Sequence, residues 1–195
     1  MKLLLIDNEL SILKFLITEF NKRVNIDLNI IALLFQNNNY DPAKQKINFL
    51  DEIENTSAST ASIYEVNGEE ALLSDEVIKF IQKELTTIPG DKRALIDIFL
   101  VNHVLGDKKF NDFESVRFAR KLLGEEIVLL REIFFYSYTR KLYTFKAEFR
   151  ENTSETFNEP LPRPAPTSGM DNKSELDRFV ERAFRKIKKE DEYAE

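Results

Sequence analysis

The sequence Arg-Ala-Leu-Ile-Asp-Ile-Phe-Leu occupies residues Arg93–Leu100 and decides the expected fold. Six of its eight residues are apolar, and such a run with β-branched and aromatic members is typical of a strand buried in a parallel sheet. Asp97 is the single carboxylate within it. A buried carboxylate is costly without a partner, and open parallel sheets bind ligands at the carboxyl ends of their strands. We therefore expect Asp97 to close a central strand, as part of a site or as a cap of the following turn.

Apolar runs and amphipathic segments alternate on both sides of this stretch. Strands are expected at Leu3–Ile6, Asn29–Phe35, Ile63–Val66, Ile133–Tyr136 and Tyr143–Phe145. Helices are expected from Ser11 to Arg23 and at Pro42–Ile53, Asp75–Leu85 and Phe113–Leu123, with a loop at Asn55–Ser62. Alternation of this kind predicts an α/β fold with a mainly parallel sheet.

Composition narrows the classes of function. The chain has 195 residues, a net charge of −6, no cysteine and one histidine, His103. Disulfides, thiolate chemistry and multi-histidine metal sites are therefore excluded. The acidic balance gives no electrostatic case for nucleic-acid binding. No apolar run approaches the length of a membrane span, so we expect a soluble, cytoplasmic protein.

The C-terminal part begins with a proline-rich stretch. Four of the six prolines fall within residues 151–173, which predicts a semi-rigid, extended linker. Residues 174–195 follow, with an amphipathic helix expected at Glu175–Glu190. This helix either packs back on the sheet as a last layer or binds a partner, which includes dimerisation through its apolar stripe.

Polar residues follow four of the expected strands. Asp7-Asn8-Glu9 ends the first, Asp97 a central one, Ser137 a later one and Lys146 the last. In a parallel sheet these ends share one edge, which would gather carboxylates, a hydroxyl and an ammonium group. Carboxylate oxygens suit Mg²⁺. A cation, a lysine and a hydroxyl could together stabilise the oxygens of a phosphoryl group.

The order of these motifs resembles the receiver domain of bacterial response regulators. The resemblance rests on Leu3-Leu-Leu-Ile-Asp-Asn-Glu9, Leu95-Ile-Asp-Ile-Phe-Leu100, Phe134-Phe-Tyr-Ser137 and Phe145-Lys146. It implies a flavodoxin-like, three-layer fold over residues 1–150, with an insertion at about residues 36–87. It also implies that a histidine kinase phosphorylates Asp97, that Ser137 and Lys146 contact the phosphoryl group, and that Asp7, Glu9 and Asp97 hold Mg²⁺.

Two departures from the family pattern shape the functional expectation. Asn8 stands where receivers usually have a second metal-binding acid, which weakens the case for Mg²⁺ unless Glu9 substitutes. Between Ser137 and Lys146 there are too few residues for the usual helix. We therefore expect an atypical receiver or pseudo-receiver, more a binding protein than an enzyme, which acts through protein–protein interaction with a histidine kinase or another signalling protein as its partner.

Two alternatives remain open at this stage. The segment Asp7-Asn-Glu9-Leu-Ser11 loosely resembles the nucleophile loop of Mg²⁺-dependent phosphohydrolases of the haloacid-dehalogenase type. The polar strand ends could equally be ordinary caps in a non-catalytic protein used for assembly.

Overall fold

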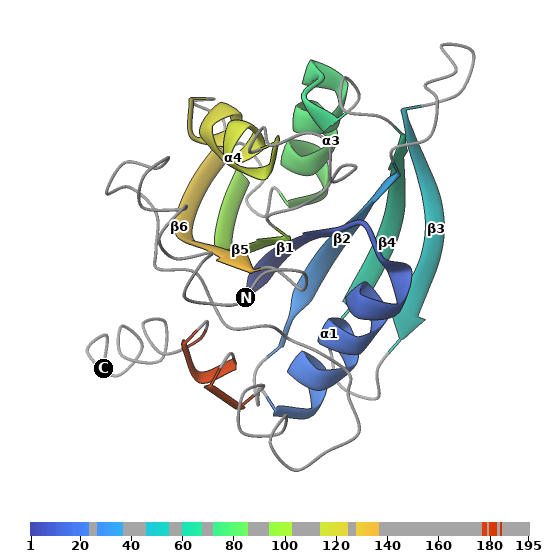
Figure 1. The fold of residues 1–195 in the computed structure, drawn as a ribbon, viewed down its shortest axis with the longest axis vertical. Coiled ribbons are helices and arrows are strands. Elements are labelled where there is room, and N and C mark those ends of the chain that lie inside the picture. The colour runs from blue at the N-terminus through green and yellow to red at the C-terminus, as the bar shows by residue number, and fades with distance from the viewer. Residues whose placement is uncertain are drawn as a thin grey trace.

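The computed structural model describes residues 1–23, 27–36, 46–54, 60–67, 72–85, 94–102, 114–124 and 128–136, together with residues 177, 178, 180–182 and 184. The described part is an α/β structure in which one sheet lies between two layers of helices (Figure 1). The coarse expectation of an α/β fold with a mainly parallel sheet is confirmed.

Six strands form the described sheet. They are β1 (Lys2–Asp7), β2 (Asn29–Gln36), β3 (Ile47–Glu54), β4 (Thr60–Asn67), β5 (Ala94–Asn102) and β6 (Val128–Tyr136). Their spatial order is β3-β4-β2-β1-β5-β6. All neighbours are parallel except β3, which runs antiparallel to β4 at one edge.

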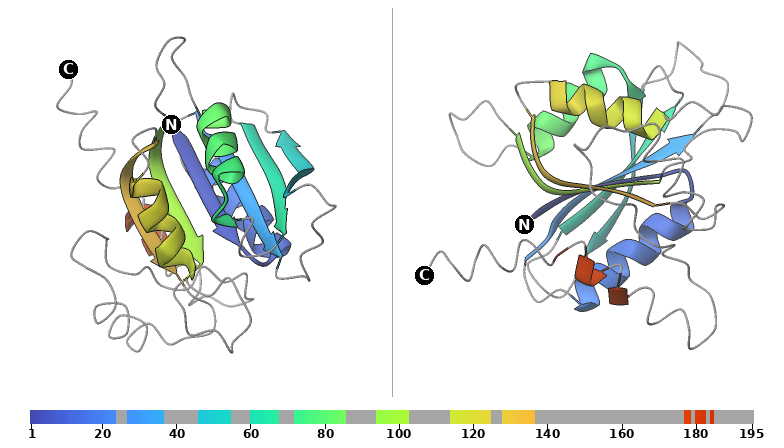
Figure 2. Two further views of the ribbon diagram at one scale, coloured as in Figure 1. Left: turned by 90° about the horizontal axis from the view of Figure 1, so that it is seen from above. Right: turned by 60° about the vertical axis from the view of Figure 1, so that its left-hand side comes forward.

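The helices cover both faces of the sheet. Helix α1 (Leu10–Arg23) lies on one face, whereas α3 (Asp75–Leu85) and α4 (Glu114–Gly124) lie on the other (Figure 2). The chain moves outward from β1 to β2 on one side, and from β5 to β6 on the other. This reversal places the helices on opposite faces, because crossovers between parallel strands are right-handed. The point of reversal lies between β1 and β5.

The core has two halves separated by the sheet. Leu3 and Leu5 of β1 face the α1 side, and Leu4 and Ile6 face α3 and α4. All four side chains are fully buried, as expected for a strand covered on both faces. Burial of such a side chain contributes about 1.5–3 kcal/mol, so β1 is the centre of the hydrophobic core.

The expected helix at Pro42–Ile53 is wrong, since residues 47–54 form strand β3. The expected loop at Asn55–Ser62 is also wrong from residue 60 onward, where β4 begins. A β-bulge shifts the β3–β4 register between Phe49 and Asp51. It turns Ile47 and Ile53 toward opposite faces of the sheet, because an extra residue breaks the two-residue alternation of a strand. The resulting three-residue apolar spacing imitates a helix.

The C-terminal helix packs against the α1 layer where the structure describes it. Val180 and Phe184 are buried in the same cluster as Leu13 and Phe20. The rings of Phe20 and Phe184 meet edge to face, with centroids 5.3 Å apart. Of the two expectations for this helix, these contacts support the packed one. The expected strand at Tyr143–Phe145 and the linker at 151–173 lie outside the described residues.

Lys121 of α4 connects the two helices on its face. Its Nζ donates hydrogen bonds to the Leu73 carbonyl and to Asp75 Oδ1 at the start of α3. The hydrogen bond and the charge of Lys121 lower the pKa of Asp75. A lowered carboxyl pKa stabilises the fold above the unfolded-state pKa, and this contribution is lost as pH falls through the folded-state value.

We predict that Lys121→Met raises the pKa of Asp75 toward its ordinary value of 3.8, because the ammonium group that favours the carboxylate is gone. The Asp75 carboxyl carbon, followed by NMR through an acid titration, measures the change. Lys79→Met is the matched control, since Lys79 has a smaller effect on the same carboxyl group. Equal shifts in both variants would contradict the assignment.

None of the helices in the described part of the chain has the length and apolar character needed to cross a membrane.

Candidate functional site

Three neighbouring strands bring polar side chains to the carboxyl edge of the sheet. Asp7, Asn102 and Tyr136 are the last residues of β1, β5 and β6. This edge lies at the point where the order of the strands reverses, which is the usual ligand position in open α/β sheets. The fold thus places a polar cluster where a binding or catalytic site is expected.

Asp7 is the centre of this cluster and is fully buried. Its Oδ2 accepts a hydrogen bond of 2.7 Å from the Tyr136 hydroxyl, which reaches over β5. Its Oδ1 accepts a hydrogen bond of 2.8 Å from the backbone N–H of Glu9, at the turn into α1. The carboxylate therefore joins the ends of β1 and β6 to the start of the first helix.

Asn8 and Asn102 extend the cluster. The side-chain amide of Asn102 donates a 3.0 Å hydrogen bond to Asn8 Oδ1, and Asn102 is only 2% exposed. Glu9 is exposed to solvent.

The arrangement does not fit Mg²⁺, the ion that the receiver resemblance implies. Mg²⁺ in proteins keeps several of its waters, whereas Asp7 has no exposed surface and each of its oxygens already accepts a hydrogen bond. Among the residues that the structure describes, no group of three or more metal-binding side chains is gathered.

Asp97 lies elsewhere, and the expectation that it ends the strand beside Asp7 is wrong. Asp97 is the fourth of the nine residues of β5. The parallel register pairs Ile98 with Leu3 and Val101 with Ile6, so the residue level with Asp7 is Asn102. The five positions from Asp97 to Asn102 correspond to about 16 Å of extended chain. Asp7, Glu9 and Asp97 therefore cannot share one cation.

The partner of Asp97 is the beginning of β1. Its Oδ2 accepts a 2.8 Å hydrogen bond from the backbone N–H of Lys2. The Lys2 side chain is itself 8% exposed, and its Nζ has no hydrogen-bond partner within the described structure. Burial lowers the pKa of Lys2, and the charge of Asp97 partly offsets this effect. These contacts make Asp97 a structural residue at the amino edge of the sheet.

Ser137 and Lys146, expected to contact a phosphoryl group, lie outside the described residues, as does His103. Sequence reasoning also missed Tyr136 and Asn102. Asn102 had a usable signal, because it is the first polar residue after the apolar run that follows Asp97. Tyr136 had none, since an aromatic residue in an apolar strand resembles a core residue.

The chain matches no protein-family model, no curated protein and no solved structure.

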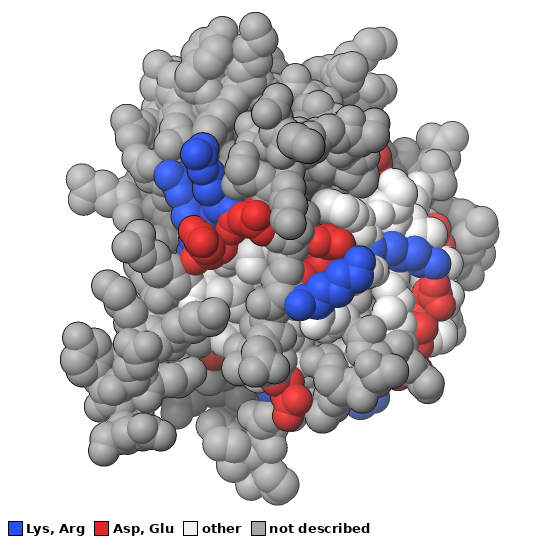
Figure 3. Space-filling view, turned by 90° about the horizontal axis from the view of Figure 1, so that it is seen from below, with Lys and Arg blue, Asp and Glu red and all other residues white. Residues whose placement is uncertain are grey.

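The charges of the described residues are mixed on the face that α1 covers. In Figure 3, basic and acidic side chains lie beside one another on this face rather than in separate fields. One such pair joins Lys14 of α1 to Asp51 of β3, with Nζ and Oδ2 2.6 Å apart. Within its described part, this face therefore lacks the continuous basic patch that nucleic-acid binding uses.

Proposed function

We propose that this chain is a pseudo-receiver: a signalling domain with a flavodoxin-like sheet that works by binding another protein and carries out no phosphotransfer. The observation that carries the proposal is the position of Asp97. Its carboxylate holds the start of β1 at the amino edge, so the residue that would accept a phosphoryl group in a receiver lies away from the edge where ligands bind.

The order of the strands supports the receiver-like part of the proposal. Without β3 and β4, the four strands β2, β1, β5 and β6 lie in the order second-first-third-fourth. This is the order of the first four strands in flavodoxin-like folds. Strands β3 and β4 fall within the segment expected as an insertion, and they lengthen the sheet beyond β2. The packing of α1 on one face and of α3 and α4 on the other also agrees with this fold.

The surface of β3 supports the binding part of the proposal. Phe49 is 60% exposed and Leu50 is 42% exposed, and both belong to the strand at the end of the described sheet. An edge strand presents unpaired backbone groups, which proteins normally protect or use for pairing with another chain. Two exposed apolar side chains on such an edge indicate that the edge pairs with another chain rather than being protected from pairing.

A phosphohydrolase of the haloacid-dehalogenase type gains no support from this geometry. Its nucleophile would be Asp7, and a nucleophile must reach a substrate from solvent. Asp7 is fully buried, and both of its oxygens accept hydrogen bonds.

We predict that the protein gains no mass when it is incubated with Mg²⁺ and a small phosphodonor, because the Asp97 carboxylate is engaged by Lys2. Intact-mass spectrometry measures the adduct, and Asp97→Asn should show no adduct either. An adduct in the wild type that Asp97→Asn abolishes would overturn the proposal. Turnover of a generic phosphate ester that Asp7→Asn abolishes would replace it with the hydrolase alternative.

A further inference from the structure

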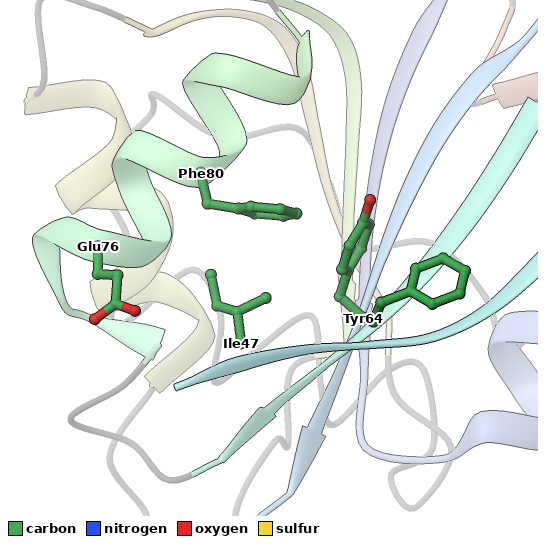
Figure 4. A pocket seen from close by; sticks show the side chains of 5 residues that line it. Ile47, Tyr64, Glu76 and Phe80 are labelled. Carbon is green, nitrogen blue, oxygen red and sulfur yellow. The ribbon is translucent and has the colours of Figure 1, made fainter. Parts of the chain in front are cut away.

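A hollow of about 330 Å³ lies between the edge of the sheet and helix α3. It is lined by Ile47, Phe49, Tyr64, Glu76 and Phe80. In Figure 4, Ile47 and Tyr64 rise from the strands, and Phe80 and Glu76 lie opposite them on α3. The rings of Phe49 and Phe80 meet Tyr64 edge to face, with centroids 5.6 and 4.6 Å away. Aromatic side chains thus form one wall of the hollow, and the hollow opens beside the edge strand β3.

Carboxylates contribute negative charge at this aromatic wall. Glu76 lines the hollow itself. Burial of Tyr64 raises its pKa, and the charges of Glu84 and Glu52 raise it further. Two of the neighbouring carboxylates form salt bridges: Lys46 Nζ is 3.8 Å from Glu76 Oε2, and Lys83 Nζ is 3.9 Å from Glu84 Oε1. The described groups whose charges act on Tyr64 are both carboxylates, which favours a cation over this part of the wall.

We propose that β3, the edge strand of the described sheet, binds a basic, extended segment of a partner protein, with one Lys or Arg side chain of that segment entering the hollow. The proposal rests on the protein-binding function proposed above and names the class of partner. An extended segment hydrogen-bonds to an open sheet edge through its backbone, and pockets beside the edge select its side chains. A cation over aromatic faces, with the Glu76 carboxylate beside them, is held by both effects.

The β-bulge argues against the other obvious occupant, a second copy of this chain. Pairing of β3 with its own copy about a twofold axis near its middle would bring the irregular Phe49–Asp51 region of both chains together. A bulge twists a strand and interrupts edge pairing. A short partner segment meets no such obstacle, because Ile47–Phe49 precede the bulge and lie beside the hollow.

The test uses a short synthetic peptide of alternating Val and Arg residues added to the whole chain. We expect NMR amide shifts that concentrate in β3 near Ile47 and Phe49, and binding that weakens as salt rises. The same peptide with Glu in place of Arg should not bind. The Val-Arg peptide with alternate backbone nitrogens methylated should not bind either, because methylation removes the donors that pair with the sheet.

Variants then locate the bound side chain. Phe49→Ala and Glu76→Gln should each weaken peptide binding about tenfold, the loss expected for part of a cation–aromatic site. Both positions are exposed, so the variants should keep the circular dichroism of the wild type. Glu181→Gln is the matched control: it removes one exposed carboxylate from the C-terminal helix, on the α1 side.

Four results would overturn the proposal: no binding of the Val-Arg peptide, unchanged binding in both pocket variants, amide shifts confined to another surface, or dimerisation of the free protein that Phe49→Ala abolishes and the peptide does not compete with. The phosphodonor experiment is independent of all these results. A failure of the peptide to bind therefore rejects the basic partner, whereas an adduct on Asp97 rejects the pseudo-receiver.

Discussion

Asp97→Ala is expected to lower the free energy of unfolding by about 3 kcal/mol, and the melting temperature by about 6–12 °C. Two losses add up in this variant. The backbone N–H of Lys2 loses its acceptor at a position where the residue is 8% exposed. The Lys2 ammonium group also loses the negative charge that offsets its burial. Chemical denaturation monitored by circular dichroism measures the effect.

Two further variants separate these losses. Asp97→Asn keeps an oxygen that can accept the Lys2 N–H, so it should cost only about 1 kcal/mol. Lys2→Met removes the buried ammonium group but keeps the backbone N–H that binds the Asp97 carboxylate, so it should cost less than Asp97→Ala. In the Lys2→Met background, Asp97→Ala should cost less than it does in the wild type. Wild-type stability of the Asp97→Ala single variant would contradict the structural role of this residue.

The pH dependence of stability gives a second measurement for the same pair. The pKa of Lys2 is lowered in the folded protein, so the unfolded chain binds the proton more tightly. Stability therefore rises with pH from the folded-state pKa up to the ordinary value of 10.5. Asp97→Ala removes the charge that opposes the shift and should steepen this rise, whereas Lys2→Met should abolish it.

Tyr136→Phe should destabilise the protein by about 2 kcal/mol, because the fully buried Asp7 carboxylate loses a charge-assisted hydrogen bond of 2.7 Å. The variant keeps the aromatic ring, so the packing against the α1 side is preserved. Thermal unfolding should show a decrease in Tm of about 4–8 °C.

Tyr64→Phe is the control for this prediction, since it removes a hydroxyl from a tyrosine that is only partly buried. A double-mutant cycle with Asp7→Asn isolates the Asp7–Tyr136 pair, and a coupling energy of about 1 kcal/mol or more is expected. If Tyr136→Phe and Tyr64→Phe have the same small effect, the Asp7 cluster is not the element that connects β1 to β6.

Local signals in the sequence predicted most of the elements. The expected bounds of α3 are those of the structure. Ser74 caps this helix, because its Oγ accepts a hydrogen bond from the Val77 N–H and its carbonyl accepts one from the Ile78 N–H, the pattern that an N-cap serine produces. Strands β1 and β5 were predicted because strands buried on both faces must be apolar throughout. The three-residue apolar spacing around the bulge concealed β3, since it has the period of a helix.

The candidate site was harder to predict, because it depends on register. An apolar run shows that β5 is buried, yet it does not show which end of β1 lies beside Asp97. The hydrogen bond from Lys2 joins residues that are 95 positions apart, and the one from Tyr136 to Asp7 joins residues 129 apart. Such pairings are set by the packing of the whole sheet. The sequence therefore indicated a polar cluster at the carboxyl edge, but it assigned Asp97 to the wrong edge.

The long separation between β1 and β5 has a consequence for synthesis in the cell. Strand β1 lies between β2 and β5 in the finished sheet, and the start of β1 is 95 positions from its contact in β5. At the usual rate of translation, β5 emerges from the ribosome about 5–20 s after β1. During this interval one edge of β1, a strand buried along its whole length, has no neighbour. A nascent chain that stalls before residue 94 should therefore attract chaperones, whereas one that extends beyond β6 should not.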